Sequence, residues 1–239
     1  ASKMEQREDA IILLQRAVEL KPKFSGAWAD LAETLSDSDE FGKALDAAQR
    51  VIKLQPSLPF GFMLRGTILG QSGNHEGAIN AYREALKIEP NHIGSNMGLG
   101  NTLKTIGDYE ESVSAYKKVI EFQPFFAEAY WSLANLKTYQ FDQKEIAQME
   151  DHIENPDIPD SNKAFLHIAL ANAKEKEKLF DKAWHHFDAG AFMRRKDEVY
   201  DSVQTQTTHD SLIEVFNKEF INEKRNLGHQ SQAPIFIVG

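Results

Sequence analysis

Residues 59–90 read PFGFMLRGTILGQSGNHEGAINAYREALKIEP and residues 93–124 read IGSNMGLGNTLKTIGDYEESVSAYKKVIEFQP, and the two stretches align without a gap at a spacing of 34 residues. The same spacing separates four prolines, Pro22, Pro56, Pro90 and Pro124. Self-similarity at a fixed period of this length is typical of solenoids, in which each unit buries its apolar face only by stacking on its neighbours. The chain is therefore expected to be a stack of repeated helical units.

The first half of each unit carries apolar and small residues at the spacing of one helical face. A bulky residue is followed by leucine, a small residue and a second leucine; these columns are Trp28, Phe62 and Tyr130, then Leu31, Leu99 and Leu133, then Ala32, Gly66, Gly100 and Ala134, then Leu35, Leu69 and Leu103. Asn96 and Arg65 depart from the first two columns. The small residue is expected where two helices pack most closely, because no side chain can separate their backbones there.

The second half of each unit also predicts a helix. Its small position holds Ala44, Ala78 or Ser112, and its ring position holds Ala48, Tyr82 or Tyr116. Gly73 and Gly107 lie between the two helices, where glycine readily takes the left-handed conformation that ends a helix. Each proline of the 34-residue series then ends the second helix, because proline cannot continue the hydrogen-bond ladder.

These columns resemble the tetratricopeptide repeat, and the resemblance covers three regular units from residue 25 to residue 126. It implies an all-α solenoid in which antiparallel helix pairs, about twelve helices in all, form a right-handed superhelix. Ala10, Leu14, Ala17 and Leu20 occupy second-helix columns with no first helix before them. Residues 1–24 are therefore interpreted as the second helix of a truncated repeat, and the chain as part of a longer array.

Composition narrows the classes of partner. The 239 residues include no cysteine, which excludes disulfides and thiolate metal sites and gives no sign of secretion. No apolar run is long enough to cross a bilayer or to serve as a signal peptide. The formal net charge is −9, which argues against nucleic acid because its binding requires Lys and Arg to displace counterions. We expect a cytoplasmic protein with a protein or peptide partner, no membrane contact and no metal site; the oligomeric state is not indicated.

The pattern loosens after Pro124. Residues 127–196 are interpreted as two divergent repeats, with a first helix at 127–137, a short helix at 143–153, and a further helix pair whose columns resume three residues late. Residues 197–233 are interpreted as a linker, polar from 200 to 206, with one helix that carries Leu212, Val215, Phe216 and Phe220. The last six residues, PIFIVG at 234–239, have the composition of a buried β-strand that ends at glycine.

The stretch from residue 127 to residue 239 resembles the connection found in bacterial tetratricopeptide-repeat sulfotransferases. The likeness rests on YWSLANLK (130–137), FDKAWHHF (180–187), MRRK (193–196), the pair Tyr200 and Asp201, and the expected strand at 234–239. In that family the strand leads into the loop that holds the 5′-phosphosulfate of the sulfate donor, 3′-phosphoadenosine-5′-phosphosulfate (PAPS). The resemblance implies that residues 234–239 begin a truncated α/β sulfotransferase domain and that Gly239 lies at the edge of its cofactor loop. No catalytic residue can be assigned, so this chain is expected to hold no cofactor itself.

Two adjacent histidines invite a metal-site interpretation. His185 and His186 point to different faces of the expected helix, and Asp181 lies one turn before His185. That arrangement is a helical pair and not a set of converging ligands, so a structural or solvated role is expected for both histidines.

The concave groove of the expected superhelix is where a partner would lie. First-helix positions two, five, nine and twelve face it, and they are Phe60, Met63, Thr67, Met97, Asn101, Lys104, Trp131, Asn135, Thr138 and Asn172. Asparagine recurs at position nine in Asn101, Asn135 and Asn172, and a carboxamide both donates to and accepts from an extended peptide backbone. These side chains are either a ladder that binds main chain or three solvated groups. Some repeat proteins grip a terminal carboxylate with Lys and Asn side chains of neighbouring first helices. Such a carboxylate clamp is not supported here, because Ala29 and Met63 stand where its first lysine would be.

Two functions follow from these observations. In the first, the chain is a protein-interaction scaffold that recruits or orients an acceptor polypeptide for a C-terminal PAPS-dependent sulfotransferase domain. In the second, it is a free-standing tetratricopeptide-repeat adaptor with no catalytic partner domain. A third candidate, the repeat region of a glycosyltransferase, shares the asparagine-rich groove but not the C-terminal strand.

Overall fold

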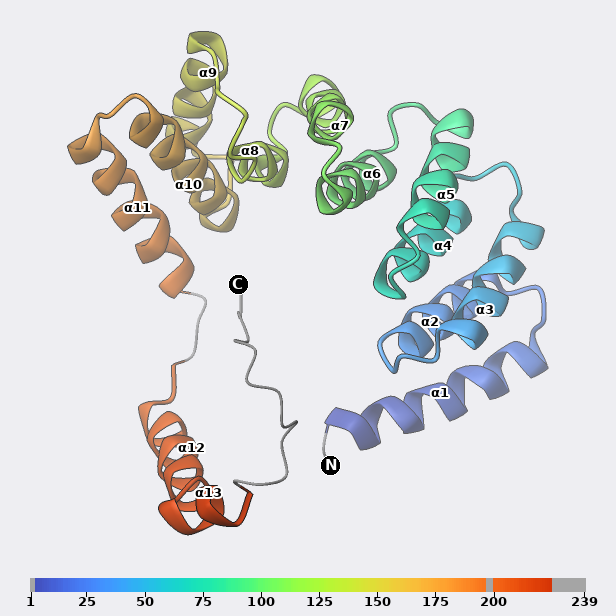
Figure 1. Cartoon of the computed structure of the whole chain (residues 1–239). Helices are drawn as coiled ribbons and strands as arrows, with labels where there is room; N and C mark the ends of the chain where they lie inside the picture. The colour runs from blue at the N-terminus through green and yellow to red at the C-terminus, as the bar shows by residue number, and fades with distance from the viewer. Residues whose placement is uncertain (1–2, 197–199, 225–239) are drawn as a thin grey trace, which may run out of the picture. The chain divides into compact units, whose positions relative to one another are not determined.

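The computed structural model describes residues 3–196 and 200–224, and within these ranges it contains thirteen α-helices and no β-strand (Figure 1). They are α1 (Lys3–Leu20), α2 (Ser25–Ser36), α3 (Phe41–Leu54), α4 (Phe60–Gln71), α5 (His75–Ile88), α6 (Ile93–Ile106), α7 (Tyr109–Phe122), α8 (Ala127–Ala134), α9 (Gln143–Glu154), α10 (Asp160–Lys176), α11 (Phe180–Arg195), α12 (Ser202–Val215) and α13 (Lys218–Lys224). The all-α repeat architecture is confirmed. Of the helices described, none combines the length and apolar character that a membrane span needs.

The chain divides into two units, residues 1–194 and residues 195–239, and each is described by itself. In the first unit, α2 packs on α3, α4 on α5 and α6 on α7, and each pair also contacts the next. The even-numbered helices α2 to α10 line the inner side of this curved unit, while α3, α5, α7 and α9 lie on its outer side (Figure 1). The inner helices are those that the sequence assigned to the groove.

Each of two repeats packs a glycine of its inner helix against a tyrosine of its outer helix. The pairs are Gly66 with Tyr82 and Gly100 with Tyr116. A Cβ atom added to Gly100 would lie 2.6 Å from the Tyr116 ring, closer than side chains pack. In the preceding repeat Ala32 and Ala48 occupy the same two positions, and both are fully buried. The ring is thus accommodated only where the facing residue has no side chain.

Asn96 departs from the bulky column but keeps a hydrogen bond of that column. The Trp28 indole Nε1 donates to the Pro22 carbonyl at 3.0 Å. Two repeats later, Asn96 Nδ2 donates to the Pro90 carbonyl at 3.0 Å. Both side chains tie the start of an inner helix to the connection before it, so this position can exchange a ring for an amide without losing the bond.

The outer helices of three consecutive repeats begin with the same kind of cap. The side-chain oxygens of Asn74, Asp108 and Asp142 accept hydrogen bonds from the backbone amides of Gly77, Glu111 and Glu145, respectively. Side-chain caps of this type satisfy amides that a helix leaves unpaired at its first turn. Because the three caps are 34 residues apart, α9 begins in register with α5 and α7, and the three-residue shift arises after α9.

The inner helix α8 ends at Ala134, before the expected end at residue 137. The Lys176 ammonium on α10 donates to the carbonyl of Leu136 at 3.3 Å and also to that of Tyr139. These bonds satisfy carbonyls of the turn that follows α8. The expected first helix at 127–137 is therefore wrong at its C-terminal end, because a side chain far along the chain stabilises a turn there.

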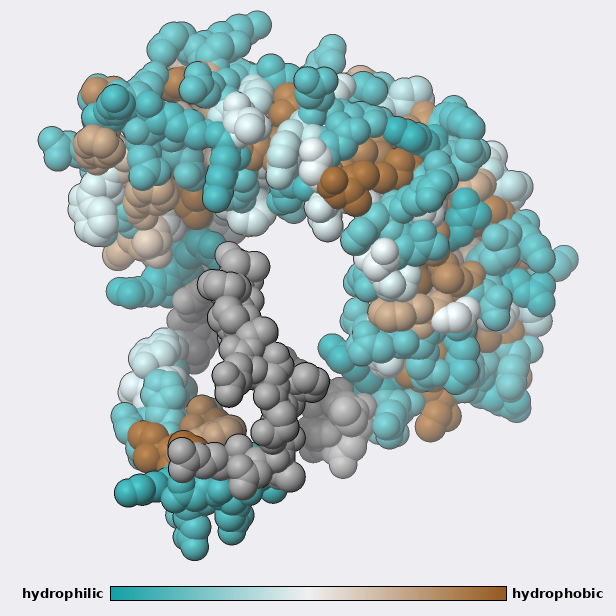
Figure 2. Space-filling view, viewed as in Figure 1, coloured by the Kyte–Doolittle hydropathy of each residue, from teal (hydrophilic) through white to brown (hydrophobic). Residues whose placement is uncertain are grey.

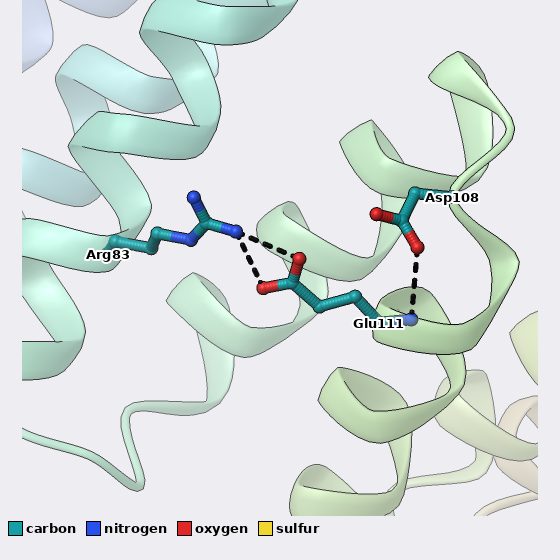
Figure 3. Close-up of polar contacts among 3 residues, drawn as sticks. All are labelled: Arg83, Asp108 and Glu111. Atoms are coloured by element: carbon teal, nitrogen blue, oxygen red, sulfur yellow. Dashed lines mark hydrogen bonds and ion pairs between the residues drawn. The ribbon is translucent and has the colours of Figure 1, made fainter.

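Neighbouring repeats are also joined by ion pairs. Arg83 Nη2 on α5 lies 2.8 Å from both carboxylate oxygens of Glu111 on α7, and the Asp108 carboxylate accepts from the Glu111 backbone amide (Figure 3). Lys117 and Glu145 repeat the pair one period later, with 3.2 Å between the ammonium and a carboxylate oxygen. The Arg83–Glu111 pair is exposed, and exposed pairs each contribute about 0–1 kcal/mol. The buried columns are therefore the main source of stability.

The second unit contains α12 and α13 where the sequence predicted a polar linker and one helix. The Asp201 carboxylate accepts from the backbone amides of Val203 and Gln204, each at 2.9 Å, so α12 begins at Ser202. The side chain of Asn217 accepts from the Phe220 amide at 2.9 Å and starts α13. The interpretation of residues 197–233 as a linker with one helix is wrong over the described residues 200–224, because two side-chain caps start two helices. The expected strand at 234–239 lies outside the described residues.

We expect Gly100→Leu to lower the free energy of unfolding by about 1–3 kcal/mol, because the new side chain would overlap the Tyr116 ring. Gly42→Leu is the matched control, since a Cβ atom at that helical glycine meets no atom within 4 Å. Thermal denaturation followed by circular dichroism measures both. Equal melting temperatures for the two variants would contradict the assignment of the glycine–tyrosine contact.

Candidate functional site

A cleft of about 450 Å³ opens between α4, α5 and α6. It is lined by Thr67, Gly70, Gln71, His75, Tyr82, Gly94, Met97, Gly98, Asn101, Thr102 and Thr105. Three of the predicted groove residues, Thr67, Met97 and Asn101, lie together in this lining. Among the lining residues there is no Asp, Glu, Lys or Arg, although hydrophilic side chains cover much of the visible surface of the unit (Figure 2).

Two tyrosines from outer helices bond to polar side chains of the cleft. The hydroxyl of Tyr116, on α7, donates to Asn101 Oδ1 at 2.6 Å. One repeat earlier, the hydroxyl of Tyr82 on α5 lies 3.2 Å from Thr67 Oγ1. Burial raises the pKa of both phenols, so each keeps its hydroxyl hydrogen at neutral pH. The two cleft side chains are thereby tied to the packed core of their own repeats.

Four further predicted groove residues lie on inner helices outside this cleft. Phe60 is the exposed first residue of α4, and Met63 and Lys104 are half-buried on α4 and α6. Trp131 on α8 packs edge-on against Phe165 of α10, with ring centroids 5.6 Å apart. Lys104 adds a basic group close to the cleft, whose own lining contains no Lys or Arg.

The three asparagines of the expected ladder have different surroundings. Asn135 is the exposed residue that follows α8, and Thr138 lies beyond the end of that helix. Asn172 Nδ2 donates to the Ile168 carbonyl of its own helix at 2.9 Å. Of the three, Asn101 alone bonds to a tyrosine hydroxyl within the described residues. Contact of these side chains with a partner stays a prediction, but the three asparagines do not have equivalent surroundings.

A histidine pair that the sequence did not predict joins α10 to α11. His167 and His186 approach to 3.0 Å between their Nδ1 atoms, and the His167 side chain is buried. Burial lowers the pKa of both imidazoles, that of His167 to about 4, and the neighbouring imidazoles add to the effect. The pairing follows the three-residue shift after α9, so the 34-residue period does not reveal it.

The remaining site predictions concern a metal and a cofactor. No three His, Asp or Glu side chains converge there to hold a metal ion. Gly239, the predicted edge of a cofactor loop, lies outside the described residues.

Two segments of the chain match models of one repeat family. Residues 59–92 match the model described as "Tetratricopeptide repeat", and residues 100–137 match the model described as "TPR repeat". The first segment coincides with the pair α4 and α5, and the second runs from the middle of α6 past α8. The chain contains tetratricopeptide repeats.

Several solved structures share this tetratricopeptide-repeat fold. BtubC (BKLC) from P. vanneervenii superposes with a TM-score of 0.60 at 15% identity over 83% of this chain and 92% of that one. MamA 41-end from Desulfovibrio magneticus RS-1 gives 0.53 at 18% identity over 73% and 97%. YrrB, described as a TPR protein with an unusual peptide-binding site, gives 0.52 at 16% identity over 76% and 92%. At these identities the likeness shows the fold alone.

One relative matches in sequence. An uncharacterized protein of Aquifex aeolicus (strain VF5) is 26% identical over 104 residues, which are 44% of this chain and 14% of that protein. This tetratricopeptide-repeat chain therefore spans a small part of the length of the relative it matches.

The histidine pair predicts a pH dependence of stability. The buried His167 stays neutral down to about pH 4, whereas in the unfolded chain it binds a proton near pH 6.5. The unfolded state thus binds more protons between these values, and the free energy of unfolding should fall by about 1–3 kcal/mol as the pH is lowered through this window. Urea denaturation at several pH values measures how steeply the free energy of unfolding changes with pH. This pH dependence should be smaller for His167→Gln than for the control His209→Gln, which alters an exposed histidine of α12. Equal pH dependences would contradict the prediction.

Proposed function

We propose that this tetratricopeptide-repeat protein is an interaction scaffold that holds an extended segment of a partner polypeptide in the cleft between α4, α5 and α6. The observation that carries the proposal is the Asn101 carboxamide, whose Oδ1 accepts from the Tyr116 hydroxyl, in a cleft lined by no Asp, Glu, Lys or Arg. Because the Tyr116 hydroxyl occupies Oδ1, the two N–H donors at Nδ2 are left to bind an acceptor. Peptide main chain supplies such acceptors without a charge.

The composition of the cleft favours main chain over a charged ligand. A carboxylate or phosphate placed there would find no Lys or Arg among the lining residues, and its desolvation would be uncompensated. Gly70 lines the same cleft, where an added Cβ atom would meet only the Ala78 Cβ at 3.9 Å, and a residue without a side chain allows another backbone to come close. The peptide-binding site described for YrrB, which shares the fold, is consistent with this use of the repeats. As part of the same proposal we place the protein in the cytoplasm, on the absence of cysteine.

Asn101→Ala should weaken binding of a partner peptide about two- to twelvefold, because one hydrogen bond of about 0.5–1.5 kcal/mol is lost. The probe is a peptide selected on the intact chain from a phage-displayed random library, and calorimetry measures its affinity. Asn80→Ala is the control, since Asn80 is an exposed asparagine of the outer helix α5. Unchanged affinity for Asn101→Ala would place the bound peptide elsewhere.

A second candidate adds a catalytic neighbour to this scaffold. In it, the groove recruits or orients an acceptor polypeptide for a PAPS-dependent sulfotransferase domain that follows the repeats. Its support is the sequence resemblance over residues 127–239 and the PIFIVG stretch. The matched family models and solved structures support the repeats and give this addition no support, so the adaptor without a catalytic neighbour is the better-supported function.

We expect the chain by itself to show no saturable binding of PAPS. Binding of that anion needs several converging backbone N–H groups at a loop and a helix N-terminus, together with cationic side chains. Calorimetry of the intact chain with PAPS is the measurement. Saturable binding in the micromolar range would mean that the chain holds a nucleotide site, and the division between a repeat scaffold and a separate catalytic domain would be wrong.

A further inference from the structure

Two equivalent positions of the cleft present opposite hydrogen-bonding chemistry. Thr67 and Asn101 are one period apart on α4 and α6, and each bonds to the tyrosine of its own repeat. The tyrosines are also one period apart, so the surrounding helices are the same in kind. What differs is which atoms are left over for a ligand.

At Asn101 the remaining groups are donors. A carbonyl oxygen carries no hydrogen, so the 2.6 Å contact at Oδ1 is a bond donated by the Tyr116 hydroxyl. That bond distinguishes the two ends of the carboxamide and sets which of them faces away from the tyrosine. The Asn101 Nδ2 group has no hydrogen-bond partner among the described residues.

At Thr67 the remaining groups are acceptors. The single hydroxyl hydrogen of Thr67 is directed to the Met63 carbonyl, with 3.2 Å between Oγ1 and that oxygen. The 3.2 Å contact between Thr67 Oγ1 and the Tyr82 hydroxyl allows either oxygen as donor, and with the Thr67 hydrogen on Met63 we assign the donor as Tyr82. Both hydrogens are used, and only lone pairs on the two oxygens are left over.

We propose that Tyr116 is a positioning residue that holds the Asn101 carboxamide with its N–H groups toward the cleft, so that the cleft pairs a donor at Asn101 with an acceptor at Thr67 and Tyr82. The inference rests on the proposed function, since it specifies how the same cleft binds main chain. An extended peptide carries C=O and N–H groups in regular order, and it can place a carbonyl at Asn101 and an amide at the Thr67 and Tyr82 oxygens.

The core makes this arrangement rigid. The Tyr116 ring is fully buried and packs on Gly100, where an added Cβ atom would lie 2.6 Å from it. A ring held this closely cannot swing its hydroxyl away, and burial keeps the phenol protonated. The amide of Asn101 is therefore oriented before a partner arrives, which lowers the entropy cost of binding.

The test combines Tyr116→Phe with single amide-to-ester replacements along the library-selected peptide. Tyr116→Phe keeps the ring and removes the hydroxyl, so the freed carboxamide can turn; we expect affinity to fall about three- to tenfold, the equivalent of roughly one hydrogen bond. In the wild type, an ester at one position should weaken binding, because an ester carbonyl accepts a weaker hydrogen bond from Asn101 than an amide carbonyl does. That penalty should shrink in Tyr116→Phe, whereas Tyr109→Phe, a change at an exposed tyrosine of the same helix, should leave affinity and ester pattern unchanged.

A second variant, Asn101→Asp, tests the donor assignment without changing a residue of the buried core. The carboxylate still accepts from Tyr116 but has no N–H to donate, so affinity should fall at least as far as in Asn101→Ala. Wild-type affinity in Asn101→Asp overturns the donor assignment, and it decides the matter even if Tyr116→Phe fails to fold. If Asn101→Ala weakens binding and Tyr116→Phe keeps the wild-type affinity and ester pattern, the positioning role is wrong while the proposed function stands. If no change at Asn101 affects the peptide, the proposed function fails as well.

Discussion

The contact between the Tyr116 ring and Gly100 supports both the fold and the cleft. It lets a large aromatic side chain of an outer helix lie directly on the backbone of the inner helix, where a Cβ atom would lie 2.6 Å from the ring. The buried ring joins the two helices into one unit, and its hydroxyl donates to the Asn101 side chain on the inner helix. A single side chain thus connects the packed column of the repeat to a polar group on the surface that a partner can reach.

The neighbouring repeats show how this constraint varies along the chain. Gly66 and Tyr82 repeat the contact, but the inner side chain is Thr67, so the same geometry leaves acceptors in place of donors. Ala32 and Ala48 fill the equivalent positions with two small residues, and no tyrosine hydroxyl reaches the inner side there. The polar pattern of the cleft is therefore confined to the two repeats that carry tyrosine.

The divergent part of the first unit keeps its register by different means. Asp142 caps α9 in step with Asn74 and Asp108, and Glu145 continues the inter-repeat ion pairs. After α9 the spacing changes, and contacts without a period take over: Lys176 satisfies the turn after α8, and His167 meets His186. These contacts hold the last helices of the unit together, and Asn172 there bonds to its own helix.

The sequence by itself determined the all-α repeat architecture, because packing columns and proline positions recur every 34 residues and each column reports a local requirement. It also placed Thr67, Met97 and Asn101 on the inner face of their helices, where they line one cleft, since position along a regular helix is enough to say which face a side chain occupies. Only the tertiary structure decided that a turn ends α8 at Ala134, that Asp201 and Asn217 start two helices in the second unit, and that Tyr116 bonds to Asn101. The end of α8 and the bond to Asn101 depend on which side chains meet between helices. The two caps depend on which of several competing hydrogen bonds forms at the start of a helix. The 34-residue period specifies neither of these choices.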